Sequence, residues 1–247
     1  MTDPQPMRAL VAGATGYTGM NVVRELRAAG IETVAHVRPD SPRLDYWRDF
    51  LGALGAQVDT TPWESAPMTQ TMQRVAPTVV FALLGTTRAR RKAVSKAGGD
   101  PQTATYAAVD YGLSSLLLQT AQAAHIAPLF VYLSAVGADP GAKGEYYGAR
   151  VKMEAELTAS GLPYIIARPS FITGEDREEK RTGERVGATV ANGLLHAVGA
   201  VGFGRLRDRY LSLNGPQLGR ALVRLAVDED VVNQVFETAA LRKKSEE

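Results

Sequence analysis

The chain has 247 residues, of which 45% are hydrophobic and 22% charged, and this suits one large α/β domain or two small ones. A formal net charge of +2 argues against attraction of nucleic acid over the whole surface. The absence of cysteine excludes disulfides, thiol catalysis and thiolate metal sites. We expect no metal site, because the three histidines, His36, His125 and His196, have no metal-ligand spacing.

The first six residues are polar and contain two prolines, so they resemble neither a signal peptide nor a membrane anchor. In the whole sequence no run approaches the roughly 20 apolar residues that a membrane-spanning helix needs. We therefore expect a cytoplasmic protein that binds neither a membrane nor nucleic acid.

Strand and helix patterns alternate through the first two thirds of the chain. Apolar runs predict strands at 7–12, 31–37, 56–60, 78–84, 128–134 and 163–167. Helical patterns follow at 20–29, 42–54, 67–75, 104–124 and 147–160. This alternation predicts an α/β fold, a doubly wound parallel sheet of the Rossmann type, with its ligand at the carboxyl edge of the strands.

The other stretches are less regular. Residues 86–103 are polar, basic and glycine-rich and predict a mobile loop, and 175–185 predict a charge-dense loop. Beyond them we expect helices at 185–198 and 216–227, a strand at 234–240 and a frayed tail at 241–247. No repeat or linker divides the chain, so we predict a single domain over 1–247, in which 170–240 form a small C-terminal substrate lid.

Three glycines, Gly13, Gly16 and Gly19, stand between the first strand and the first helix. Bare backbone at Gly13 and Gly16 lets a diphosphate approach, while Gly19 lets the helix lie close to the sheet. The first amides of the helix face the anion. The spacing alone is a weak signal, but a strand before it and a helix after it predict a dinucleotide site.

The residue that follows the second strand selects between NAD and NADP, because an acid there bonds the ribose hydroxyls and a cation there accepts the 2′-phosphate. Arg38 stands directly after the strand and Arg43 is close behind, and a guanidinium can hold a phosphate at two points. Asp40 is the competing candidate, as a ribose-binding acid, and a solvated Arg38 is the third interpretation. We favour NADP(H).

A polar stretch also follows the strand at 78–84. Gly85 lets the backbone pass close to the adenosine half of a dinucleotide, and Thr86 and Thr87 can bond a ribose or phosphate. Four cations come next, Arg88, Arg90, Arg91 and Lys92. They could clamp a phosphate or an acidic substrate, although charge runs are usually solvated, and both interpretations stand at this point.

Further segments occur in order along the chain, namely Val109-Asp110-Tyr111, LSAVGA from Leu133 to Ala138, Val151-Lys152-x-Glu154-x-Glu156 and Arg168-Pro169-Ser170. Together with the motifs above, they resemble the atypical short-chain dehydrogenase/reductase superfamily over about residues 7–175. The nearest branch is that of NAD(P)H-binding proteins similar to the human Tat-interacting oxidoreductase-like protein. The resemblance implies a Rossmann fold that binds NADP(H). It also implies that the cofactor is lined by Gly13, Thr15, Gly16, Tyr17, Thr18, Gly19, Arg38, Leu84, Gly85, Thr86 and Lys152, with Pro169 and Ser170 near the nicotinamide.

Active members of that superfamily use a tyrosine and a lysine four residues apart on one helix, and a serine or threonine after the fifth strand. Residues i and i+4 share a helix face, so the lysine can stabilise the tyrosinate while the tyrosine exchanges a proton with the substrate oxygen. This chain departs from the pattern, because Gly148 stands four residues before Lys152.

Tyr147 stands five residues before Lys152, and Tyr146 has the four-residue spacing to Arg150 instead. The context Val-Lys-x-Glu-x-Glu favours Lys152 as the family lysine. We therefore predict a distorted catalytic set of Tyr147, Lys152 and Ser134, in which Gly148 loosens the start of the helix.

Three functions are compatible with these residues. The first is an NADP-dependent oxidoreductase acting on a small carbonyl or alcohol. The second is an NADPH-binding protein with weak turnover, serving as a redox sensor or scaffold. The third is a nucleotide-sugar epimerase or dehydratase, although such enzymes usually have a larger C-terminal domain. The expected partner is a small-molecule substrate, and a homodimer is also considered.

Overall fold

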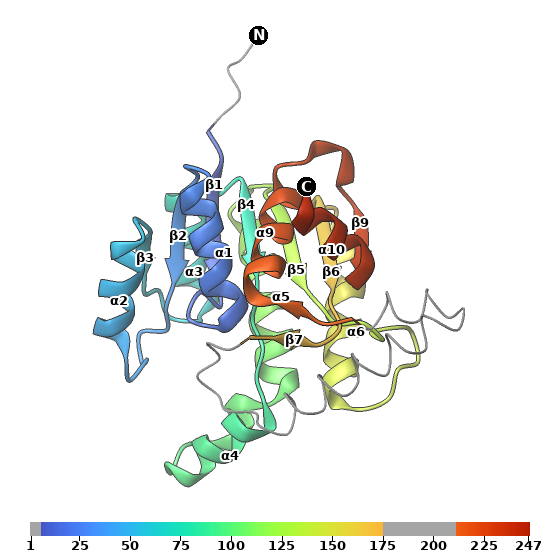
Figure 1. Cartoon of the computed structure of the whole chain (residues 1–247). Helices are drawn as coiled ribbons and strands as arrows, with labels where there is room; N and C mark the ends of the chain where they lie inside the picture. The colour runs from blue at the N-terminus through green and yellow to red at the C-terminus, as the bar shows by residue number, and fades with distance from the viewer. Residues whose placement is uncertain (1–5, 175–210) are drawn as a thin grey trace.

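A computed structural model describes residues 6–174 and 211–247 (Figure 1). Seven parallel strands form one sheet in the order β3-β2-β1-β4-β5-β6-β9. Their bounds are β1 Arg8–Ala12, β2 Glu32–His36, β3 Gln57–Asp59, β4 Val79–Ala82, β5 Leu129–Leu133, β6 Tyr164–Arg168 and β9 Gln234–Glu237. The order reverses between β1 and β4, which is the switch point where doubly wound folds bind ligands. The predicted fold class is confirmed.

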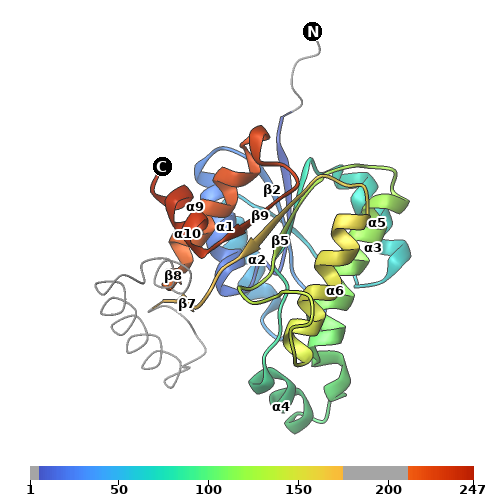
Figure 2. The same cartoon turned by 90° about the vertical axis from the view of Figure 1, so that its right-hand side faces the viewer.

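Helices cover both faces of the sheet (Figure 2). One layer contains α1 (Tyr17–Ala28), α2 (Leu44–Ala53), α9 (Gly215–Ala226) and α10 (Thr238–Glu246), and the other contains α3 (Ser65–Val75), α5 (Ser114–Ala123) and α6 (Glu145–Ala159). Successive residues of β4 alternate between the layers, since Phe81 packs into the first core and Val80 into the second. Both faces are buried, which explains why the strand sequences are apolar throughout.

The C-terminal segment packs closely against the first helix. The Tyr17 hydroxyl accepts a hydrogen bond from the Gly215 amide at 3.2 Å and donates one to the Thr173 carbonyl at 3.3 Å. A Cβ at Gly219 would lie 2.9 Å from the Asn21 backbone. Glycine therefore allows α1 and α9 to pack closely, and β7 (Ile172–Thr173) pairs with β8 (Leu213–Asn214) beside them.

The predicted loop at 86–103 is wrong, because it contains α4 (Arg88–Lys96) and a 3-10 turn at Pro101–Ala104. The Thr87 side chain caps α4 by accepting the Arg90 amide at 3.0 Å. Alanine, arginine and lysine are good helix formers, and this propensity outweighs the polarity that indicated a loop. The helix predicted at 104–124 begins as a π-helical segment, η2 (Ala107–Leu113), before continuing as α5.

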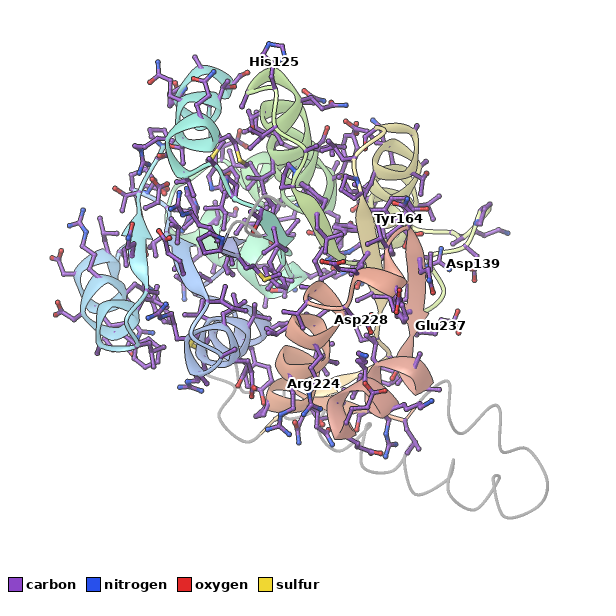
Figure 3. All side chains as sticks on the ribbon, turned by 90° about the horizontal axis from the view of Figure 1, so that it is seen from above. His125, Asp139, Tyr164, Arg224, Asp228 and Glu237 are labelled. Atoms are coloured by element: carbon purple, nitrogen blue, oxygen red, sulfur yellow. The ribbon has the colours of Figure 1, made fainter. Side chains whose placement is uncertain are left out.

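The tail predicted to fray at 241–247 belongs to α10. Leu241 is fully buried, and the Lys244 ammonium lies 2.7 Å from Asp228. Arg224 of α9, which is labelled in Figure 3, donates to the Lys244 carbonyl at 3.0 Å. The strand predicted at 234–240 is correspondingly shorter, since its last residues start this helix.

The predicted lid over 170–240 is described only in part. In that part β9 pairs with β6 as the last strand of the sheet, and α9 packs on α1. The loop predicted at 175–185 and the helix predicted at 185–198, with His196, lie outside the described residues. Within residues 6–174 and 211–247, no helix has the length and apolar character needed to span a bilayer.

Candidate functional site

The glycine turn has the backbone geometry that a close ligand approach requires. Gly13 follows β1 with a φ of +86°, and a Cβ there would lie 2.6 Å from the Leu83 carbonyl oxygen at the end of β4. The Gly16 amide donates to the Gly13 carbonyl at 2.9 Å. A Cβ at Gly19 would overlap that same carbonyl oxygen. The turn therefore depends on glycine at Gly13 and Gly19.

Backbone amides at the start of α1 face the carboxyl edge of the sheet. The N-cap residue is Gly16, so no side chain caps the first amides of α1, and the first turn contains no acidic residue. Free amides and the helix dipole at such an end favour an anion. Thr15 is half-buried in the turn and Thr18 is buried behind it. The cradle fits the diphosphate of a dinucleotide.

The two residues that compete for the adenosine ribose lie together after β2. The Arg38 guanidinium and the Asp40 carboxylate form an exposed ion pair at 3.1 Å. Arg43 instead lies over the ring of Tyr46 at 4.2 Å and that of Trp47 at 5.3 Å. Arg38 is therefore the cation that stands directly at the end of β2, and an exposed pair of this kind is weak enough to exchange for a phosphate.

His36, the last residue of β2, supports this end of the site. Its side chain is buried, Nε2 lies 2.8 Å from the Thr61 carbonyl, and its ring lies 4.4 Å from that of Trp63. Burial lowers the pKa of His36. The folded protein thus holds this imidazole in its neutral form.

We expect the free energy of unfolding to fall as the pH drops below about 6.5, the pKa of an unperturbed histidine. In that range His36 is protonated in the unfolded chain but stays neutral in the folded protein. Uptake of one proton by the unfolded state lowers the free energy of unfolding by at most about 1.4 kcal/mol per pH unit. Urea unfolding between neutral and mildly acidic pH measures the slope. His36→Gln should make the slope shallower, whereas His125→Gln, at an exposed histidine, should leave it unchanged. An identical slope in both variants would exclude His36 as its source.

A buried ion pair fixes the ends of β4 and β5. Arg150 of α6 donates to Asp110 at 2.6 Å, to the Tyr132 hydroxyl at 3.2 Å and to the backbone carbonyls of Leu84 and Leu133. Arg150 is 5% exposed and Asp110 is fully buried. Burial raises the pKa of Tyr132 to about 12, so its hydroxyl stays protonated. This cluster joins α6, η2 and two strands of the sheet.

The same pair positions the segment after β4. The second Asp110 oxygen accepts the Thr86 amide at 2.9 Å, and the Thr86 hydroxyl donates to the Ala104 carbonyl at 3.2 Å. A Cβ at Gly85 would lie 3.2 Å from the Arg150 guanidinium, so glycine leaves room for it. Arg150 Nε is buried and has no hydrogen-bond partner among the described residues. The Asp110–Arg150 pair thus holds Gly85 and Thr86 in place at the carboxyl edge of the sheet.

Two tyrosines begin α6, and they have different surroundings. The Tyr146 ring lies 5.3 Å from that of Tyr106 and 5.4 Å from the Arg150 guanidinium. The Tyr147 ring lies against Gly137 in the loop after β5, where an added Cβ would be 3.5 Å away. Tyr146 and Arg150 therefore share one face of the helix.

The structure does not bring Lys152 to these groups. Its side chain is exposed, and its ammonium lies 4.1 Å from the centre of the Tyr111 ring on η2. A helix turns by about 100° per residue, which places Tyr147 and Lys152 about 140° apart around α6. The buried side of the helix carries Ala149, Arg150 and Met153 instead.

Ser134 is engaged in a second buried network. Its hydroxyl donates to Glu154, which also accepts two hydrogen bonds from Arg168 at 3.0 and 2.5 Å. Further along, the Pro169 carbonyl accepts the Val136 amide at 2.9 Å, and the Ser170 hydroxyl donates to the Leu211 carbonyl at 2.8 Å. These contacts hold the loop after β5 and the chain after β6 at the carboxyl edge.

The sequence predicted no role for Asp110, which appeared only in the segment Val109-Asp110-Tyr111. Arg150 was considered as a partner of Tyr146, but Lys152 was preferred as the family lysine. A signal for Arg150 was present in the helical period, because Ala149, Met153 and Leu157 form an apolar stripe that Arg150 flanks and Lys152 does not. The partner Asp110 could not be found this way, since it lies 40 residues earlier in the chain.

The chain is similar to known proteins in sequence and in fold. A family described as NAD(P)H-binding matches residues 13–194. No curated protein matches the sequence.

Within residues 6–174 and 211–247 no group of three or more His, Asp or Glu side chains could hold a metal ion.

Solved structures share the fold at low identity. A putative NAD-dependent epimerase/dehydratase from Bacillus halodurans is 19% identical with a TM-score of 0.67, over 97% of this chain and 99% of that one. The UDP-glucose 4-epimerase of Thermotoga maritima, solved with UDP-glucose, is 19% identical with a TM-score of 0.63, over 96% and 81%. A putative epimerase from Burkholderia cenocepacia is 20% identical with a TM-score of 0.63, over 95% and 78%.

Proposed function

Since this chain belongs to the NAD(P)H-binding family, we propose that it is an NADP(H)-dependent oxidoreductase of the atypical short-chain dehydrogenase/reductase type, acting on a small carbonyl or alcohol. The observation that carries the proposal is the glycine cradle. It leaves the amides of α1 without a cap at the switch point of the sheet. Arg38 stands on one side of this cradle, and the ends of β4 and β5 stand on the other.

In this proposal the backbone from Gly13 to Gly16 and the first turn of α1 hold the diphosphate. Arg38 binds the 2′-phosphate, and the segment from Leu84 to Thr86 passes beside the adenosine half. Pro169 and Ser170 lie near the nicotinamide. The bound cofactor supplies or accepts the hydride.

Proton transfer is assigned to the start of α6. Tyr146 is the favoured donor because it shares a helix face with Arg150, a permanent cation whose guanidinium lies 5.4 Å from the centre of its ring. Tyr147, predicted from the sequence together with Lys152 and Ser134, is the alternative. The Ser134 hydroxyl would have to leave Glu154 before it could contact a substrate oxygen.

NADPH should raise the melting temperature more than NADH at equal concentration, because only NADPH has the phosphate that Arg38 can hold. Arg38→Gln should weaken NADPH by about tenfold or more, since a hydrogen bond to a charged group contributes roughly 1.5–3 kcal/mol. NADH affinity should change little. Calorimetric titration of both cofactors measures the difference.

Arg48→Gln is the matched control, because Arg48 is a solvated arginine of α2, paired with Asp45 at 3.4 Å. Equal losses for NADPH in the two variants, or equal thermal shifts for NADPH and NADH, would remove the NADP assignment.

A nucleotide-sugar epimerase or dehydratase is the second candidate, favoured by the epimerase structures that share this fold. Such an enzyme regenerates its cofactor in each cycle, whereas the proposed reductase consumes NADPH. Net loss of NADPH absorbance with a panel of small aldehydes and ketones would support the reductase. Conversion of UDP-glucose without net cofactor loss would support the epimerase. Tight NADPH binding with neither reaction would favour the redox sensor or scaffold.

A further inference from the structure

A cavity of about 430 Å³ opens beside α4, at the end of the sheet where β4 leaves it. Its wall is formed by α4 and the two threonines before it, the 3-10 turn at Pro101–Ala104, the two residues that precede η2 and the first residue of α6. In Figure 1, α4 lies beyond the carboxyl edge of the strands. This volume lies within the usual range of about 300–1,000 Å³ for small-molecule sites.

Cationic side chains dominate the charge of this cavity. Arg88, Arg91 and Lys92 line it together with one acid, Glu145, so the lining carries a net charge of +2. The Arg91 guanidinium lies 3.9 Å from Glu145, whose side chain is 77% exposed, and such a pair is weak. In the described parts of the chain, Arg88 and Lys92 have no ion pair. The hydroxyls of Thr86 and Thr105, which also line the cavity, already donate to the Ala104 and Gln102 carbonyls, so the cations are its main donors.

The cavity also adjoins the residue favoured for proton transfer. Tyr106 lines it, and the Tyr106 ring packs edge-on against Tyr146 with centroids 5.3 Å apart. Arg38 follows β2, on the opposite side of β1 from β4, and neither Arg38 nor any residue of the glycine cradle lines the cavity. Apart from Thr86, the residues that would hold an anion here are therefore different from those proposed for the cofactor.

We propose that this cavity binds the phosphate group of a phosphorylated substrate. A phosphate monoester carries about −1.5 to −2 charges near neutral pH, which matches the lining, whereas a single carboxylate would leave a cation uncompensated. The cavity is larger than a phosphate, so the organic part of the substrate has room to extend past Tyr106 toward Tyr146. That the organic part of the substrate reacts beside Tyr146 rests on the proposed function, whereas the binding of an anion in the cavity does not.

Titration calorimetry with inorganic pyrophosphate tests the site on the full chain saturated with NADP⁺, so that the glycine cradle is occupied. Wild-type protein should bind pyrophosphate, and the double variant Arg88→Gln/Lys92→Gln should bind it at least about tenfold more weakly, since two charge-assisted contacts are lost. Lys96→Gln is the matched control, because Lys96 is an α4 lysine that does not line the cavity. It should bind within about twofold of wild type, as screened surface charges contribute little.

Loss of pyrophosphate binding on NADP⁺ saturation would assign the anion to the cofactor site and overturn the proposal. Equal affinity in the double variant and the wild type would also overturn it. If neither NADPH nor NADH binds, the proposed function fails, and the same titration without cofactor still decides the anion site through the two variants. Melting temperatures confirm that the variants, changed only at α4 side chains, are folded.

Discussion

Replacing Arg150 with alanine is expected to lower the free energy of unfolding by about 3–5 kcal/mol, the usual cost of breaking a buried ion pair from one side. The substitution leaves the fully buried Asp110 carboxylate facing an empty space, and it removes donors from the Leu84 and Leu133 carbonyls. The Leu133 carbonyl ends β5 and the Leu84 carbonyl lies just after β4, so losing these contacts also loosens the chain around the candidate site. Urea unfolding followed by circular dichroism measures the change.

Two further variants make this expectation specific. Arg48→Ala removes an exposed pair and should cost less than about 0.5 kcal/mol. The double variant Asp110→Ala/Arg150→Ala should lose less than the sum of its single variants, because the second substitution removes the buried charge that the first one exposes. Additive losses, or an Arg150→Ala effect as small as that of Arg48→Ala, would show that the pair does not hold these strand ends.

The fold could be predicted from the sequence because each of its signals is local. The strand at Val79–Ala82 is apolar on both faces, and Gly13 marks the turn where β1 ends. The loop prediction at 86–103 failed for a local reason too. Its charges indicated solvent exposure, but arginine, lysine and alanine form a helix equally well when they are exposed.

The site was harder to predict because its contacts are long-range. Lys152 was chosen from a short sequence context, whereas the burial of Arg150 depends on Asp110 and on the ends of two strands. Spacing along one helix identifies which residues share a face, but not what that face meets. The cavity at α4 likewise depends on Glu145, which joins Thr105 and Tyr106 in its wall only in the folded chain.

Removing the hydroxyl of Tyr146 is expected to lower kcat by roughly 10²–10⁴-fold, the usual contribution of a general acid–base group. The phenylalanine in Tyr146→Phe keeps the packing against Tyr106, so NADPH affinity and melting temperature should remain near wild type. The measurement is NADPH consumption with whichever carbonyl of the panel the wild-type protein reduces.

Tyr147→Phe is the matched control, because it removes a hydroxyl from the neighbouring residue of the same helix turn. If Tyr146 is the proton donor, Tyr147→Phe should retain turnover within a few fold, since its ring lies against Gly137 rather than beside Arg150. The reverse pattern would return the role to Tyr147. Full turnover in both variants would exclude tyrosine acid catalysis at this helix. The two variants thus test which face of α6 reaches the substrate. The four-residue spacing between Tyr146 and Arg150 predicts that it is their shared face, whereas the assignment of Lys152 as the catalytic lysine does not.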